Sequence, residues 1–263
     1  MKACVLASGS KGNVCYVETN NHNILIDIGR NKKYIVEKLK DINILPETID
    51  IILISHLHKD HISALNTFIN AYKPVVCITK KMYEELDSIK NYPFLHLYED
   101  NIELDDITIK AIKSSHDATD SRNFVIEEDG KSLVYITDTG YIRHKYFNDI
   151  VNKNVYLLES NHDIEMLTHG PYPEWLKSRV ISDEGHLSNQ SAGFYLSKLI
   201  GQNTKEVILM HLSEVNNTES IALATVNDVL KEYNVEFQNI KCAKQNESGE
   251  LIEVWLKLFV LEK

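Results

Sequence analysis

The segment His56-Leu57-His58-Lys59-Asp60-His61 gathers three imidazoles and a carboxylate within six residues. It directly follows Ile49-Asp50-Ile51-Ile52-Leu53-Ile54-Ser55, an apolar run that is typical of a strand. Crowded imidazoles and carboxylates lose solvation unless a cation compensates them, so packing alone does not explain this cluster. Nitrogen and carboxylate oxygen are common ligands of divalent metals. The cluster therefore predicts a metal site at the end of a strand.

Four further polar residues each follow an apolar run: Asp27, His116, Asp138 and His211. Taken alone, each would more often cap a helix or form a turn than bind a metal. In an α/β architecture, however, strand ends collect at one edge of a sheet, where ligands bind. We therefore expect these residues to converge on the His56 cluster. Asp117 could share the task of His116.

The ordered series His-x-His-x-Asp-His, isolated His, isolated Asp and last His resembles the metallo-β-lactamase superfamily. The resemblance runs from Asp27 to His211 and implies an α/β fold, the four-layer αββα metallo-β-lactamase sandwich, with two divalent metal ions between the sheet edges. It implies one metal held by His56, His58 and His116, another held by Asp60, His61 and His211, and Asp138 bridging the two. By the same pattern, Asp27 orients the imidazole of a ligand histidine without binding the metal itself.

The predicted reaction is hydrolysis. Two cations about 3.5–4 Å apart can convert a shared water into hydroxide near neutral pH and hold both oxygens of a displacement. The ligand set contains no thiolate, which suits Zn²⁺, Mn²⁺ or Fe²⁺ without choosing among them. We take Zn²⁺ and Mn²⁺ as the leading candidates.

Several branches of the superfamily fit poorly. Ser114-Ser115-His116-Asp117 stands where glyoxalase-like and lactonase-like members have Thr-Pro-Gly-His, and the export signal typical of true β-lactamases is missing. The stretch from Asp138 to His211 is too short for the inserted domain of the RNA-processing nucleases. No arm of the tRNA-end-processing type is seen.

Gly185-His186-Leu187-Ser188-Asn189, at the start of a predicted helix, resembles the phosphodiesterase branch. There a histidine beside a helix start contacts the scissile phosphate or protonates the leaving oxygen. Free N–H groups at a helix start bind anions, and imidazoles exchange protons near neutral pH. We predict His186 as catalytic, together with Asp60 and His162, and Ser188 and Asn189 as substrate-binding residues. Alternatively, Ser188 or Asn189 only caps the helix and His186 lies in a loop.

A nearly full-length resemblance points to the YycJ (WalJ) group of bacterial proteins, regarded as DNA exonuclease-like. The motifs that carry it are Ala7-Ser8-Gly9-Ser10-Lys11-Gly12-Asn13, Ser115-His116-Asp117-Ala118, Glu159-Ser160-Asn161-His162-Asp163, Tyr172-Pro173 with Leu176-Lys177-x-Arg179, and His211-Leu212-Ser213-x-x-Asn216-Asn217. By position, His162 would face the site, and Lys177 and Arg179 would neutralise phosphate or simply be surface cations.

Composition narrows the partners but leaves alternatives. The net charge of -10 argues against a broad surface for nucleic-acid phosphates. A nucleic-acid or nucleotide phosphodiester remains the predicted substrate, with a DNA or RNA exonuclease favoured. Cyclic mononucleotide hydrolysis of the phage anti-Pycsar type is the runner-up, and a non-catalytic binding protein that keeps the fold is a third possibility.

Further expectations concern location, assembly and organisation. A membrane helix and a signal-peptide core are both missing, which favours a cytoplasmic protein that does not bind membranes. At 263 residues, one domain spanning 1–263 is the default, and residues 172–175 could reach a partner in a homodimer. Periodicity predicts a helix from Ile62 to Tyr72 and strands at 102–112 and 253–260. Residues 163–185 form the least regular stretch, a candidate substrate-facing loop.

Overall fold

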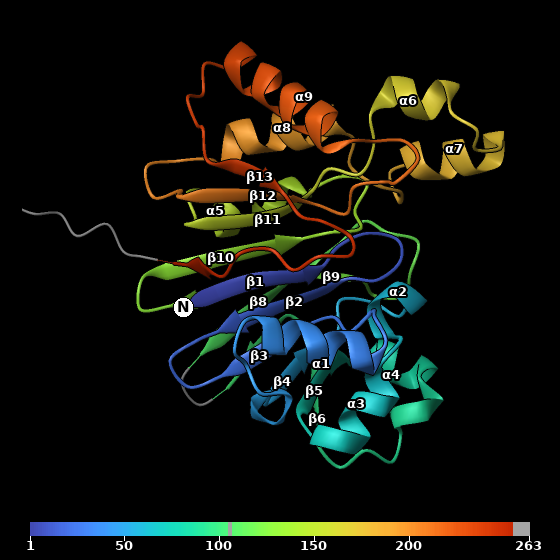
Figure 1. Cartoon of the computed structure of the whole chain (residues 1–263), viewed down its shortest axis with the longest axis vertical. Coiled ribbons are helices and arrows are strands. Elements are labelled where there is room, and N and C mark those ends of the chain that lie inside the picture. The colour runs from blue at the N-terminus through green and yellow to red at the C-terminus, as the bar shows by residue number, and fades with distance from the viewer. Residues whose placement is uncertain (105–106, 255–263) are drawn as a thin grey trace, which may run out of the picture.

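The computed structural model describes residues 1–104 and 107–254 of the chain. Within these ranges the strands form two seven-stranded mixed sheets that pack face to face, and helices cover both outer faces (Figure 1). This is the predicted αββα sandwich. The expected strand at 253–260 lies mostly outside the described residues, of which only β14 (Ile252–Glu253) is assigned.

The first sheet has the order β14-β1-β2-β3-β4-β5-β6. Its strands after β14 are β1 (Lys2–Ala7), β2 (Val14–Glu18), β3 (Asn23–Ile26), β4 (Ile51–Leu53), β5 (Val75–Thr79) and β6 (Leu95–Tyr98). Strands β14 to β3 pair antiparallel, whereas β3 to β6 pair parallel.

The second sheet has the order β13-β12-β11-β10-β9-β8-β7 and repeats this plan. Its strands are β7 (Asn101–Glu103), β8 (Thr108–Lys113), β9 (Arg122–Glu128), β10 (Lys131–Ile136), β11 (Val155–Glu159), β12 (Glu206–Met210) and β13 (Ile240–Cys242). Strands β7 to β10 pair antiparallel, and β10 to β13 pair parallel. The single strand predicted at 102–112 is therefore wrong, because β7 and β8 form a hairpin there.

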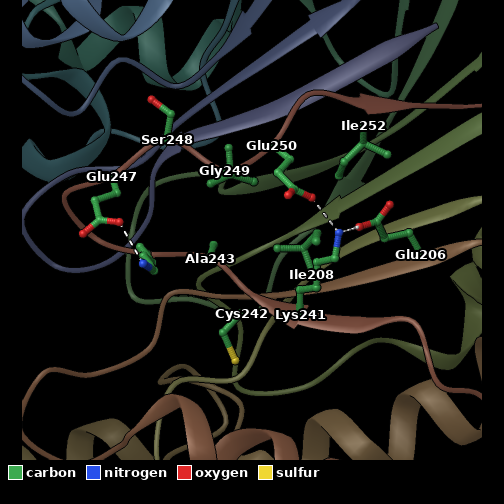
Figure 2. Close-up of a pocket in the computed structure, with 12 residues that line it drawn as sticks. Glu206, Ile208, Lys241, Cys242, Ala243, Glu247, Ser248, Gly249, Glu250 and Ile252 are labelled. Atoms are coloured by element: carbon green, nitrogen blue, oxygen red, sulfur yellow. Dashed lines mark hydrogen bonds and ion pairs between the residues drawn. The ribbon is translucent and has the colours of Figure 1, made fainter. Parts of the chain in front are cut away.

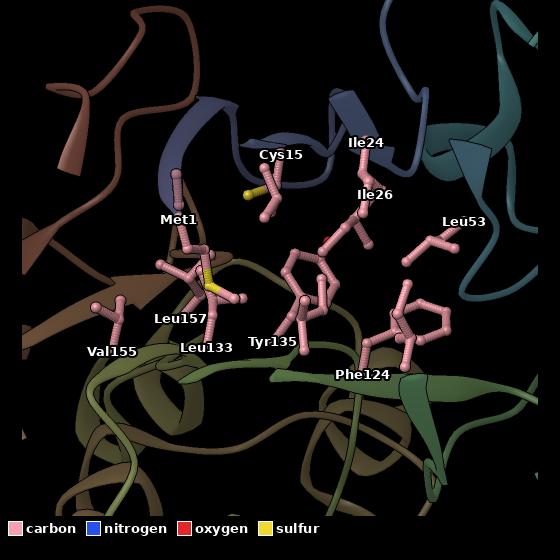
Figure 3. Packing of buried hydrophobic residues seen from close by; sticks show 14 of the residues in the cluster. Met1, Cys15, Ile24, Ile26, Leu53, Phe124, Leu133, Tyr135, Val155 and Leu157 are labelled. Carbon is pink, nitrogen blue, oxygen red and sulfur yellow. The ribbon is translucent and has the colours of Figure 1, made fainter. Parts of the chain in front are cut away.

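Alternation along the strands builds the core between the sheets. Ile24 and Ile26 point inward from the first sheet, and Phe124, Tyr135 and Leu157 meet them from the second (Figure 3). All five are at most 1% exposed. Burying an apolar side chain of this size contributes roughly 1.5–3 kcal/mol, so the interdigitated layer fixes how the two sheets face each other.

The outer faces pack against helices. The helices over the first sheet are α1 (Lys32–Asp41), α2 (Lys59–Ile62), α3 (Leu65–Tyr72) and α4 (Lys80–Glu85). The helices that pack on the second sheet are α5 (Phe147–Ile150), α8 (Asn189–Leu199) and α9 (Glu219–Glu232). Two further helices are α6 (Ile164–His169) and α7 (Glu174–Ile181). The helix predicted from Ile62 to Tyr72 is split, because Ser63 and Ala64 separate α2 from α3. No helix of the described chain is both long and apolar enough to span a bilayer.

The prediction for residues 163–185 is corrected as well. The stretch contains two short helices, α6 and α7, which lie beyond the strand ends beside α8 in Figure 1. Asp163 caps α6 by accepting a hydrogen bond from the Met166 N–H, 2.9 Å long. The apolar periodicity of these helices is weak because few of their side chains are buried, so the sequence pattern resembles a loop.

Candidate metal centre

The predicted metal-binding side chains all lie at the carboxyl ends of strands. Asp27 follows β3, His116 follows β8, and Asp138 and His211 follow β10 and β12; His56 follows β4, and the remaining cluster residues start α2. Asp27, Asp138 and His211 have positive φ angles of 60°, 49° and 56°. Such a conformation costs of order 1–3 kcal/mol in a non-glycine residue and is concentrated at functional sites. It turns each side chain toward the same end of the sandwich.

Three imidazoles form one group of donor atoms. Donor nitrogens of His56, His58 and His116 lie within 4.8 Å of one another, and His116 Nε2 is 3.3 Å from His58 Nδ1. His56 Nε2 is buried and has no hydrogen-bond partner in the described chain. Burial lowers the pKa of both His56 and His116, which keeps their lone pairs available. An orphaned buried nitrogen among neutral imidazoles fits a divalent metal.

Asp138 lies between this group and the other predicted ligands. Its Oδ2 is 3.2 Å from His61 Nε2, and its Oδ1 is 3.4 Å from His211 Nδ1 and 3.9 Å from His116 Nε2. Burial would raise the pKa of this carboxyl, but the imidazoles of His211 and His61 hold it well below its usual value. The ionised carboxylate can therefore face donors on both sides.

Asp60 lies with His61 and His211 in the second group of predicted ligands. Its Oδ2 lies 3.6 Å from His61 Nε2 and 4.0 Å from His211 Nε2, and the latter atom is buried without a partner among the residues described. Burial would lower the pKa of His211, but Asp138 and Glu159 raise it to about 9. A cation would replace a proton here, so its binding would be coupled to proton release. All seven residues predicted as ligands are brought together.

Asp27 is hydrogen-bonded to the ring of His61. The His61 Nδ1–H donates to Asp27 Oδ2 over 2.7 Å, which leaves His61 Nε2 facing the site. The same fully buried carboxylate accepts hydrogen bonds from the Ser55 N–H and hydroxyl and from the Tyr135 hydroxyl. This arrangement fixes both the tautomer and the direction of the His61 ring.

Asp27→Asn should weaken metal binding about 10–100-fold, the usual cost of altering a partner behind a metal ligand. The amide keeps the size of the side chain but loses the charge that makes the His61 ring basic. Competition with a chelating dye measures the effect, and Asp41→Asn, on the exposed end of α1, is the matched control. Unchanged affinity in Asp27→Asn would contradict this role.

Glu159, at the end of β11, was not predicted as a site residue. Its Oε1 accepts hydrogen bonds from His186 Nδ1 (2.7 Å) and His211 Nδ1 (2.9 Å), and its Oε2 accepts from the Thr139 and Leu187 N–H groups. Burial would raise the pKa of Glu159, but the two imidazoles lower it to about 2. Glu159 thus does for His211 and His186 what Asp27 does for His61. In the sequence, the signal for a role of Glu159 in the site was its position at the end of a strand.

His186 lies beside the predicted ligands. Its ring centroid is 5.3 Å from that of His116 and 5.2 Å from that of His211, and its Nδ1 is 3.7 Å from Asp138 Oδ1. Because Glu159 holds Nδ1, the free nitrogen is Nε2, and the side chain is 13% exposed. The geometry suits a proton donor at the edge of the site, although the donor atoms of Asp138, Glu159, His186 and His211 also lie within 4.8 Å of one another.

His162 lies in the same neighbourhood but is buried, at 2% exposure. His162 forms an isolated parallel β-bridge with Ser188, and its carbonyl accepts a hydrogen bond from the Asn189 N–H over 2.9 Å. Its Nδ1 has no partner within the described part of the chain, and burial lowers its pKa to about 4. A neutral, enclosed His162 supports the start of α8, and its predicted catalytic role stays a prediction.

His162 should make the fold sensitive to acid. Its pKa is lower in the folded than in the unfolded chain, so its contribution to stability is complete above about pH 6.5 and is lost as the pH falls toward 4. Chelator-treated wild type should therefore lose about 2 kcal/mol more unfolding free energy between pH 7.5 and pH 5 than His162→Gln. Urea unfolding at both pH values measures this, and equal losses would refute it.

The other predicted substrate contacts have different environments. Ser188 caps α8 by accepting the Ser191 N–H, whereas Asn189 is fully buried and bonded to Ser160 and Asn217. We therefore leave the Asn189 side chain out of the proposed substrate contacts. Its inaccessibility follows from the buried amide network, which the sequence did not reveal.

Lys177 and Arg179, the two side chains predicted to neutralise phosphate, also have different hydrogen-bond partners. Lys177 Nζ donates to the Thr168 carbonyl and pairs with Glu174, which ties α7 to α6. Arg179 binds both carboxylate oxygens of Asp117, at 2.5 and 2.9 Å, and Asp117 Oδ1 is 3.5 Å from His116 Nε2. Arg179 therefore lies at the rim of the metal centre and neutralises the charge of Asp117, whereas Lys177 joins α7 to α6.

A separate cavity of about 320 Å³ lies between β13 and residues 247–252. Among the residues that line it, Lys241 forms ion pairs with Glu206 and Glu250, and Ile208 and Ile252 are apolar (Figure 2). The predicted metal-binding residues are not among those that line it in the described chain. The predicted metal-binding residues therefore lie apart from the lining of this cavity.

Comparison with known proteins identifies the family of this chain. The family profile described as "Beta-lactamase superfamily domain" matches residues 22–212, which include every predicted ligand. The chain belongs to the metallo-β-lactamase superfamily. The structure of the metallo-β-lactamase fold protein YhfI from Bacillus subtilis has a TM-score of 0.69 at 16% identity, covering 95% of this chain and 99% of that one. At this identity the likeness concerns the fold alone.

Two curated relatives within the superfamily are more similar in sequence. The exodeoxyribonuclease WalJ of Streptococcus pneumoniae is 36% identical over 232 residues, covering 86% of each chain. The exodeoxyribonuclease YycJ of Bacillus anthracis is 34% identical over 233 residues, covering 87% of this chain and 88% of the relative. The resemblance to the YycJ (WalJ) group is confirmed over most of the chain.

Proposed function

We propose that this protein is a metal-dependent phosphodiesterase that removes nucleotides from the ends of DNA with the help of two divalent metal ions. The observation that carries the proposal is the position of Asp138 between two sets of donor atoms. The exodeoxyribonuclease relatives supply the substrate class. Zn²⁺ and Mn²⁺ both suit the nitrogen and carboxylate ligands.

The proposed ligands are those predicted for each position: His56, His58 and His116 on one side, Asp60, His61 and His211 on the other, with Asp138 shared. Bound there, two cations would supply a hydroxide nucleophile and stabilise the charge of the displacement. His186 Nε2 would donate a proton to the leaving oxygen, while Glu159 holds its Nδ1–H. Arg179, at the rim, would offer its guanidinium to the phosphodiester.

A panel of substrates tests this proposal. The protein, loaded with Zn²⁺ or Mn²⁺, would be incubated with end-labelled linear DNA, end-labelled RNA, a closed circular DNA and cyclic mononucleotides. We expect mononucleotide release from linear DNA and none from the circle. Cleavage of cyclic mononucleotides alone would favour the small-phosphodiester alternative, and failure to bind any metal would favour the non-catalytic one.

Assembly remains a separate proposal. Trp175 and Ile181 on α7 and Ile164 on α6 are 68%, 55% and 41% exposed, so this pair of helices presents apolar side chains to solvent. A second copy could cover them, as expected from the Tyr172 to Trp175 segment. Light scattering measures the mass of the assembly.

A further inference from the structure

The loop between β1 and β2, residues Ser8 to Asn13, is hydrogen-bonded to the ligands proposed for one metal position. Ser8 Oγ accepts the His211 N–H over 2.8 Å, and the Asn13 N–H donates to the Asp60 carbonyl over 2.8 Å. The hydrogen bonds of the described chain include none from this loop to His56, His58 or His116. The loop therefore acts on the side formed by Asp60, His61 and His211.

Asn13 brings a side chain to this side as well. Its Nδ2 is 3.0 Å from His61 Nε2 and 3.5 Å from Asp60 Oδ2. Because His61 donates its Nδ1–H to Asp27, its Nε2 carries the lone pair, and the amide is the donor. Asn13 thus lies within hydrogen-bond distance of both side chains, and a metal bound to the His61 Nε2 lone pair would leave the amide to Asp60 Oδ2.

The amide is itself held rigidly. Asn13 Oδ1 accepts the Gly9 N–H over 2.9 Å, and Nδ2 also donates to the Gly9 carbonyl over 3.2 Å. Gly9 and Gly12 have φ angles of 137° and 147°, which favour glycine and allow the tight turn. The residue is 1% exposed. A side chain fixed at both ends of its amide is suited to positioning its neighbours.

The backbone around Asn13 is closely packed against Asp60. The Gly29 N–H donates to the Asn13 carbonyl, and a Cβ on Gly29 would lie 1.5 Å from the Asp60 carbonyl oxygen. Any side chain at position 29 would push the Asp60 backbone away from the loop. The start of α2 is therefore set by the loop as well as by its own sequence.

We propose that Asn13 is a positioning residue that sets the affinity of the Asp60, His61 and His211 position for its metal. This inference rests on the proposed two-metal function and deepens it. With the His61 lone pair given to the metal, the amide would hold the Asp60 carboxylate toward the same position, so its removal should weaken this one position. The three-imidazole position should keep its affinity.

The test is a metal titration of the full chain after chelator treatment, with Zn²⁺ and with Mn²⁺, followed by calorimetry and elemental analysis. In Asn13→Ala we expect one position about 10–100-fold weaker and the other unchanged. Asn13→Ser, which keeps a short donor, should fall between this variant and wild type. Lys11→Ala, in the same loop but paired with Glu214 at the surface, is the control and should match wild type.

Several outcomes separate the two claims. If wild type binds only one metal, the two-metal proposal fails. If wild type binds two and Asn13→Ala binds both equally well, only the role of Asn13 is overturned, as it also is if both positions weaken together. If Asn13→Ala does not fold, Asn13→Ser carries the test, and unchanged affinity at both positions in that variant would overturn the proposal.

Discussion

Asp138→Asn should reduce turnover of linear DNA by about 10³-fold or more and should leave the protein short of metal. Asp138 is the carboxylate that approaches His61, His116 and His211 at once. Paired metals stabilise the transition state by several kcal/mol, and each 1.36 kcal/mol is a factor of ten in rate. The amide keeps the size of the side chain but removes the charge that two cations would share.

Elemental analysis and turnover should be measured on the same preparation of Asp138→Asn. Asp149→Asn, on α5 and paired with Lys110, is a matched surface control and should behave as wild type. Two tightly bound metals in Asp138→Asn, or activity within tenfold of wild type, would contradict the bridging role.

His186→Ala should lower the rate of phosphodiester cleavage about 10²–10⁴-fold, the usual contribution of a general acid. Metal content should change little, because the proposed ligand set does not include His186. Glu159 accepts the His186 Nδ1–H, so the proton that His186 donates is the one that Nε2 carries in the imidazolium. The loss should be much smaller for a p-nitrophenyl phosphodiester, whose leaving group needs no proton.

The comparison of leaving groups separates acid catalysis from a structural effect. His169→Ala, at the exposed end of α6, is the control and should leave both rates unchanged. Loss of metal from His186→Ala would assign His186 to the metal centre with Glu159 and His211. Equal losses on both substrates would mean that His186 does not protonate the leaving oxygen.

The sequence predicted those parts of the site that depend on local order. The His56 to His61 cluster follows a strand directly, and the isolated Asp27, His116, Asp138 and His211 each follow an apolar run, so strand ends alone place them at one edge. The sandwich itself followed from the resemblance to the superfamily. These features could be predicted because strand direction and side-chain alternation are encoded over a few residues.

Features that depend on distant contacts were missed. Glu159 reads as the polar end of a strand, and its role appears only when β11 lies beside β12 and the loop before α8. Asn13 reads as a turn residue after Gly12, yet it meets Asp60 and His61 across the sheet. Asn189 reads as a helix start, yet it is enclosed by a polar network.

The account as a whole is tested most directly by measuring the rate of hydrolysis of end-labelled linear DNA against the number of metal ions bound per chain. We predict little hydrolysis at one bound ion and full activity at two, with His56 and His211 as ligands on opposite sides of Asp138. Full activity at one ion, or no DNA hydrolysis at two, would contradict the account.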